Sequence, residues 1–94
     1  MKAQQFYVMN QIAIFNKGEI WLQSYDSIVC KVNDVEVVMF KNWDYSITTL
    51  KYVKLFIQQY APSLYIEIMK QGRNVFKKGV EKLIKNGNII YKEA

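Results

Sequence analysis

Hydrophobic and polar residues alternate through most of the first half of the chain. Apolar residues recur with a period of two, which predicts a strand over residues 5–15 with a break near Asn10. These positions are Phe6, Val8, Ile12 and Ile14. Residues 16–18 end in a glycine and predict a hairpin loop. A long second strand is expected over residues 19–32, and its polar centre at residues 24–27 indicates a bulge or bend.

Asn33-Asp34 is the clearest tight-turn signal in the sequence. Read as a two-residue hairpin, it places Val32 opposite Val35, Lys31 opposite Glu36 and Cys30 opposite Val37. The Lys31–Glu36 pair would then contribute roughly 0.2–1 kcal/mol across the strands. A third strand, residues 35–41, follows the turn.

A helical period begins after Trp43 and predicts a central helix over about residues 46–60. Its apolar side holds Leu50, Val53, Ile57 and Tyr60, with Ile47 and Phe56 as flanks. Asp44 or Ser46 can cap this helix, because a short side-chain oxygen accepts a hydrogen bond from a free backbone N–H. Pro62 biases the residue before it away from helical angles and ends the helix.

The C-terminal third is less uniform. Residues 63–71 fit a strand by alternation and equally fit a short helix, so both remain open. Asn74 is a candidate cap for a basic helix over about residues 74–86, and Gly87 is a plausible residue to end it. The apolar residues 89–91 predict a short last strand.

These elements predict one α+β domain that spans residues 1–94. We expect an antiparallel β-meander of three or four strands, covered by the central helix (about 46–60). The basic C-terminal helix (about 74–86) and the short last strand complete the fold.

Composition supports a folded chain, since 51% of its 94 residues are hydrophobic and 15% are aromatic. No apolar run approaches the roughly 20 residues that span a bilayer, so no membrane contact is expected. Cys30 is the only cysteine, which excludes an intrachain disulfide and favours a reducing cytoplasm. Its place in an alternating run predicts a buried, unreactive thiol.

The chemistry of catalysis is poorly represented. The chain has no histidine, which removes the usual general base and the commonest metal ligand. The eight carboxylates are scattered, and the glycines form no phosphate-binding motif. We therefore expect no enzyme, no catalytic residues, no cofactor and no metal.

Positive charge is concentrated in the second half. Residues 1–47 carry four lysines and five carboxylates (net −1), whereas residues 48–94 carry nine basic and three acidic residues (net +6). The candidate residues for contact with an anionic partner are Arg73, Lys77, Lys78, Lys82 and Lys85. A stripe of this kind can follow phosphates, although a solvated helix face is the commoner role. Because all but one of the basic residues are lysine, non-specific contact is favoured over reading of DNA bases.

Two further surfaces are candidates for protein contact. Lys51, Tyr52 and Leu55 fall on the outward side of the central helix, where a Tyr–Leu pair is typical of an interface. The second face of the sheet is unusually apolar, so either the C-terminal elements cover it or it contacts a partner or a second copy of the chain.

Two segments carry a resemblance to a known group of proteins. They are Ser24-Tyr25-Asp26-Ser27-Ile28-Val29 and Trp43-Asp44-Tyr45-Ser46-Ile47-Thr48-Thr49-Leu50-Lys51-Tyr52. Together they resemble small, uncharacterised bacteriophage proteins in which a Ser-Tyr-x-Ser/Thr hairpin precedes a Trp-Asp-Tyr-Ser-x-Thr-Thr-x-Lys helix start. The match covers about residues 19–57. It implies an accessory protein in the host cytoplasm that acts in host takeover or against host defences.

The leading hypothesis is therefore a non-catalytic phage protein that binds and inhibits a host factor, such as an anti-CRISPR or another anti-defence inhibitor. Its partner would be a host protein or a protein–nucleic-acid complex. One alternative is a small nucleic-acid-binding protein of phage replication or transcription that uses the C-terminal helix. A second alternative is a structural or regulatory homodimer.

Overall fold

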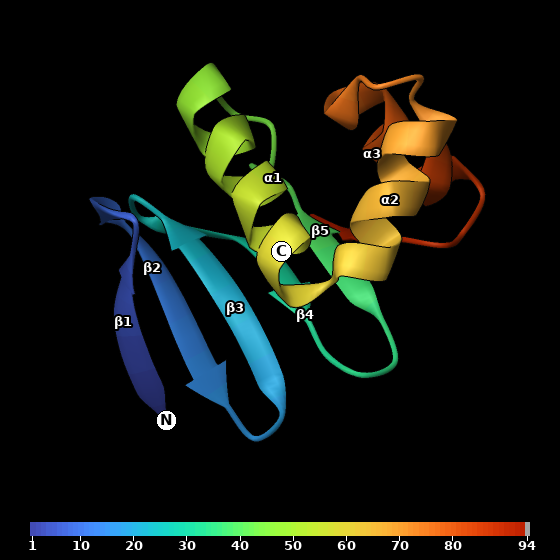
Figure 1. Ribbon diagram of the computed structural model, residues 1–94. Helices are drawn as coiled ribbons and strands as arrows, with labels where there is room; N and C mark the ends of the chain where they lie inside the picture. Colours follow the sequence, from blue (N-terminus) through green and yellow to red (C-terminus); the bar gives the residue numbers. More distant parts are fainter. Residues whose placement is uncertain (94) are drawn as a thin grey trace.

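The computed structural model describes residues 1–93 and combines one six-stranded sheet with three helices (Figure 1). The strands are β1 (Lys2–Phe6), β2 (Val8–Asn16), β3 (Glu19–Ser24), β4 (Ser27–Val32), β5 (Val37–Phe40) and β6 (Ile90–Lys92). The helices are α1 (Ile47–Tyr60), α2 (Pro62–Gln71) and α3 (Phe76–Lys85). Strands neighbour one another in chain order, and all pairs are antiparallel except β5–β6. The α+β class is confirmed, with the expected antiparallel meander, helices and short last strand; the meander has five strands, β1 to β5, where three or four were expected.

The first predicted strand is in fact the hairpin β1–β2. Tyr7 turns the chain with a positive φ of 67°, and Phe6 pairs with Val8 on either side of it. The predicted break near Asn10 is wrong, because β2 runs through that residue without interruption. No glycine or proline marks the turn at Tyr7, and the apolar alternation continues across it.

The second predicted strand is also a hairpin. The expected irregularity at residues 24–27 is confirmed in position, but it is a full reversal between β3 and β4. Tyr25 adopts a φ of 55°, and its N–H donates to the carbonyl of Asn10 at 2.8 Å. This bond joins the β3–β4 turn to the beginning of β2.

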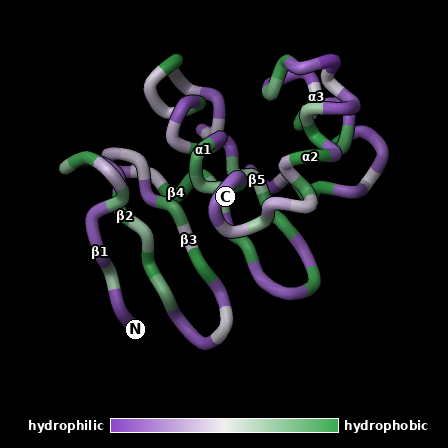
Figure 2. Tube along the Cα trace, viewed as in Figure 1, coloured by the Kyte–Doolittle hydropathy of each residue, from purple (hydrophilic) through white to green (hydrophobic). Residues whose placement is uncertain are grey.

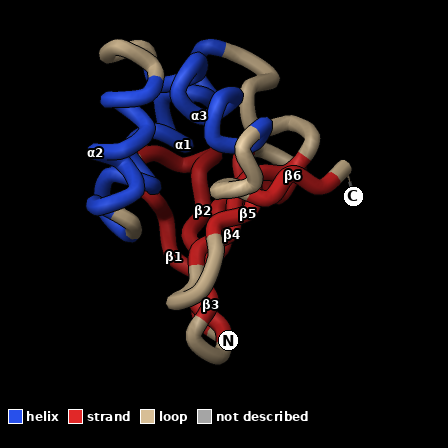
Figure 3. The backbone as a smooth tube through the Cα atoms, turned by 90° about the vertical axis from the view of Figure 1, so that its right-hand side faces the viewer, coloured by secondary structure: helices blue, strands red, loops and turns tan. Residues whose placement is uncertain are grey.

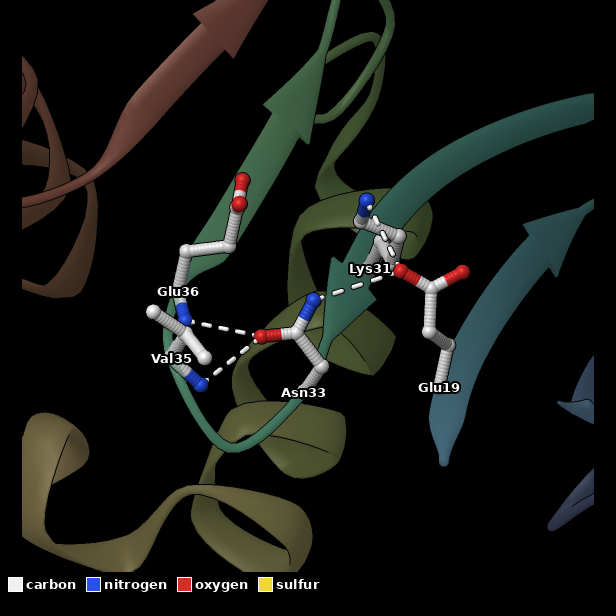
Figure 4. Close-up of polar contacts among 5 residues, drawn as sticks. All are labelled: Glu19, Lys31, Asn33, Val35 and Glu36. Carbon is white, nitrogen blue, oxygen red and sulfur yellow. Dashed lines mark hydrogen bonds and ion pairs between the residues drawn. The ribbon is translucent and has the colours of Figure 1, made fainter. Parts of the chain in front are cut away.

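The loop between β4 and β5 is longer than predicted. Val32 pairs with Val37 and Lys31 pairs with Val38, so residues 33–36 form the connection and the two-residue register is wrong. The Asn33 side chain explains why the loop is longer. Its Oδ1 accepts hydrogen bonds from the backbone N–H groups of Val35 and Glu36, each at 2.8 Å (Figure 4). Lys31 pairs with Glu19 at 3.1 Å instead of with Glu36.

Helix α1 follows the prediction closely. Ser46 is the N-cap, and its Oγ accepts from the N–H of Thr49 at 3.1 Å. Asp44 lies outside the cap. The helix ends at Tyr60, and it packs Val53, Phe56 and Ile57 into the core. Ile47, expected as a flank of the apolar side, is 89% exposed.

The ambiguous stretch 63–71 is helical and belongs to α2, whose first residue is Pro62. Proline is tolerated there because the first N–H of a helix has no intrahelical partner. A tight turn that includes Gly72 leads to α3. Asn74 is not the cap of α3: it has a φ of 70°, and Val75 occupies the N-cap position.

The helices form one layer beside the sheet (Figure 3), and their apolar sides share a single core with it. On the other face of the sheet, Trp21 stacks on Phe40 with ring centroids 6.0 Å apart. Val38 is fully buried, and Phe40 is 9% exposed. Strand β6 extends the sheet beside β5. The apolar second face is therefore buried in part by its own cross-strand neighbours.

Candidate functional site

The predicted contact surface on α1 is only partly present. Lys51 is exposed, but Tyr52 is buried, with 8% of its surface exposed, and Leu55 is half-buried against the core. The β1–β2 turn reaches this side of α1, with the rings of Tyr7 and Tyr52 6.5 Å apart. The Lys51 Nζ lies 5.4 Å from the centre of the Tyr52 ring. The prediction of Tyr52 as an exposed anchor is therefore wrong.

The predicted basic residues are exposed, four of them on α3 and Arg73 in the turn before it. We call Arg73, Lys77, Lys78, Lys82 and Lys85 the cationic surface, and all five are exposed. The opposite side of α3 is buried through Phe76, Gly79, Val80 and Leu83. Lys77 Nζ lies 3.5 Å from Asp44 Oδ2. Within residues 1–93, the other four members of the surface form no ion pair.

A cleft of about 580 Å³ lies between the β3–β4 turn and the beginning of α1. We call it the α1 cleft. It is lined by residues 24–27, Val29, Asn42, Tyr45, Ser46, Thr48 and Thr49. The sequence-based predictions assigned no site here. Most of the lining nevertheless belongs to the two segments of the phage resemblance, so the fold brings these segments together.

Hydroxyl groups connect the two sides of the α1 cleft. Ser24 Oγ and Thr49 Oγ1 are 3.0 Å apart and buried. Ser46 Oγ donates to the same Thr49 Oγ1 at 3.3 Å. On the outer side, Asn42 Nδ2 donates to Ser27 Oγ at 3.3 Å. These bonds hold the hairpin turn against the start of the helix.

The α1 cleft contains one charged side chain, that of Asp26, and no lysine or arginine lines it. The rings of Tyr25 and Tyr45 are exposed at its edge, with 50% and 73% of their surfaces accessible. Figure 2 shows apolar segments near the β1–β2 turn and near the start of α1. Met9 in β2 and Ile47, the first residue of α1, are exposed. This end of the molecule is therefore rich in tyrosine and hydroxyl groups and poor in charge.

Two further ionisable groups, Cys30 and Glu19, have pKa values that their surroundings shift. Burial raises the pKa of the Cys30 thiol, which keeps it protonated and unreactive. Hydrogen bonds from Lys31 and then Asn33 lower the pKa of the Glu19 carboxyl. Among residues 1–93, no group of three or more acidic or cysteine side chains could hold a metal ion. None of the helices described has the length and apolar character to cross a membrane.

The model of a family of unknown function, DUF8033, matches residues 1–76. The chain belongs to DUF8033. The matched region contains the whole α1 cleft, whereas four of the five residues of the cationic surface lie beyond it. No curated protein matches the chain, and no solved structure matches it.

Proposed function

We propose that this member of DUF8033 is a non-catalytic phage accessory protein that binds a host factor in the host cytoplasm and inhibits it. An anti-CRISPR or another anti-defence inhibitor is the concrete form of the proposal. The phage context rests on the resemblance of residues 19–57. The binding role rests on one observation, the exposed lysines of the cationic surface that lie on α3.

The cationic surface is suited to an anionic partner. Lys78, Lys82 and Lys85 are exposed on a helix whose other side is anchored in the core. Glu81 is the only acidic residue of α3, so the field of this face is positive. Such a field accelerates encounter with a partner of opposite charge and selects against basic partners. The partner would therefore present an acidic protein patch or a nucleic acid held by a protein.

Capture from host lysate, with and without nuclease, tests this proposal. One stoichiometric protein partner that survives nuclease is expected with the wild-type chain. The triple variant Lys78→Glu, Lys82→Glu, Lys85→Glu should lose that partner. The matched control is Lys2→Glu, Lys17→Glu, Lys41→Glu, which changes the net charge equally at three exposed positions outside α3. Equal loss of the partner in both triple variants would contradict a specific role for the cationic surface.

Direct binding of nucleic acid is the second candidate, because the same lysines could neutralise phosphates. It predicts that affinity for a labelled oligonucleotide falls steeply with salt, with a slope of about −0.9 per phosphate neutralised on duplex DNA. Fluorescence anisotropy of the wild-type chain at two salt concentrations measures this slope. A nuclease-sensitive smear in the capture experiment, together with a steep slope, would favour this candidate over the inhibitor.

A further inference from the structure

The α1 cleft has the size of a small-molecule site and is open to solvent on one side. Its volume of about 580 Å³ lies within the range of roughly 300–1,000 Å³ that ligand pockets occupy. Its walls come from a hairpin turn and a helix start that are joined by the Ser24–Thr49 hydrogen bond at 3.0 Å. Because this bond already fixes the wall of the cleft, little conformational entropy is lost there when a ligand binds.

The hydrogen-bonding groups in the cleft fall into two sets. Thr49 Oγ1 is bonded to both Ser24 Oγ and Ser46 Oγ, so these three hydroxyls are used within the protein. The second set is free to meet a ligand. Asp26 offers two acceptor oxygens, Asn42 offers its Oδ1, and Thr48 can both donate and accept, while Ser27 Oγ already accepts from Asn42 Nδ2 and has its proton left to donate. The free set is rich in acceptors and therefore suits a ligand with several O–H groups.

Charge narrows the class of ligand further. An anionic ligand is disfavoured, because Asp26 repels it and no basic side chain lines the cleft. Asp26 is the one counter-charge that the cleft offers a cationic ligand, and it is exposed to solvent, so it favours a cation only weakly. A neutral ligand remains. The exposed rings of Tyr25 and Tyr45 supply flat apolar faces against which the C–H side of a sugar ring can pack.

We propose that the α1 cleft binds a neutral sugar ring through its vicinal hydroxyl groups. Asp26 and Asn42 accept hydrogen bonds from the two hydroxyls, and the rim tyrosines pack against the ring. This chemistry occurs in the ribose of a nucleoside and in the pyranose of a glycan. The proposal goes beyond the host-factor role, because it uses no residue of the cationic surface.

Amide chemical-shift titration of the full chain tests the proposal with defined probes. The probes are adenosine, methyl β-glucopyranoside and, as a matched control without the diol, 2′,3′-dideoxyadenosine. We expect adenosine or the glucoside to shift the amides of residues 24–27 and 45–49, while the dideoxynucleoside does not. A shift by adenosine alone indicates a nucleoside, and a shift by the glucoside alone indicates a glycan.

Variants locate the site. Asp26→Asn should weaken the binding of the active probe about tenfold, the effect of losing one hydrogen bond to a charged acceptor. Asp34→Asn, an exposed carboxylate in the β4–β5 loop, should leave the affinity unchanged. The Lys78, Lys82 and Lys85 triple variant should also bind the probe normally, so failure of the host-factor proposal would not affect this result.

Three outcomes would overturn the proposal. One is the absence of cleft shifts with adenosine and the glucoside at about 10 mM, a concentration that reveals even weak binding. Another is equal binding of dideoxyadenosine, which would show that the diol is not read. The third is a shift of the same amides by inorganic phosphate or putrescine but not by the two sugar probes, which would identify a charged ligand.

Discussion

Helices α2 and α3 approach so closely at Gly79 that no side chain fits between them. A Cβ atom added at Gly79 would lie 1.9 Å from the carbonyl oxygen of Ile68 and 2.8 Å from its Cγ2. Ile68 is fully buried and cannot move toward solvent. Gly79→Ala therefore forces the two helices apart.

The size of the effect follows from the geometry. Carbon and oxygen make ordinary contacts at about 3.3 Å, so the 1.9 Å separation requires a movement of about 1.4 Å between the helices. Overpacking of this kind costs about 1–3 kcal/mol and occasionally more, and here it acts on backbone atoms. Alanine offsets about 1 kcal/mol through its better helix propensity. Because the clash is with backbone atoms, the upper end of that cost applies, and the net loss is about 2 kcal/mol, which lowers Tm by about 8–16 °C in a domain of this size.

Thermal and urea unfolding followed by circular dichroism measure this loss. Lys78→Ala is the matched control, since it places alanine on the exposed side of the same helix and should change stability by no more than about 0.5 kcal/mol. A Gly79→Ala variant with a Tm equal to or above that of the wild type would refute the close packing of α2 on α3. The comparison separates the general effect of an added alanine in α3 from the contact between the helices.

Three further predictions concern stability. Ser46→Ala removes the cap hydrogen bond from the Thr49 N–H and should lower the free energy of unfolding in urea by about 1 kcal/mol. Ser46→Asp can still cap the helix, so an equal loss of stability in that variant would contradict the role of Ser46 as the N-cap. Gln11 is fully buried, and neither atom of its amide has a partner among the described residues. Gln11→Met should therefore raise the free energy of unfolding by about 1 kcal/mol, whereas a decrease would show that the amide is satisfied. Burial raises the pKa of Cys30 in the folded state, so the folded chain retains a proton that the unfolded chain releases above about pH 8.5. The stability contribution of Cys30 is complete below that pH and is lost as the pH rises, so the wild type should lose more stability than Cys30→Val between pH 8 and 10.

Elements of the fold could be predicted from the sequence where capping or turn residues and the hydrophobic period indicated the same structure. Helix α1 is the best example, because Ser46 supplies the cap and the buried positions repeat with a helical period. The hairpin loop at residues 16–18 has Gly18 with a φ of 80°, as its residue type predicts. Residues 63–71 could not be decided locally, because packing of Ile68 against α3 selects the helix.

The errors arose where distant segments decide the structure. The turn at Tyr7 has no local turn residue and is held by tertiary contacts, among them the packing of Phe6 on Phe56 with ring centroids 5.7 Å apart. Tyr52 lies on the outward side in a helical projection, but the same hairpin covers it. A helical projection of α1 alone does not show that the β1–β2 turn packs against its outward side. Both errors therefore have one physical cause, the extension of the β1–β2 turn onto α1.

The two segments of the phage resemblance contain two kinds of residue, and the structure separates them. Ser24, Ser46 and Thr49 are used in capping and in the hydroxyl network, so the fold alone accounts for them. Asp26 and Tyr45 differ, because both are exposed and neither side chain forms a hydrogen bond or ion pair among the described residues. Exposed polar and aromatic groups at the edge of a cleft add little to stability, but they are the groups that a ligand can reach. The α1 cleft is therefore one place in the molecule where exposed side chains are not used by the fold, as the proposed sugar site requires.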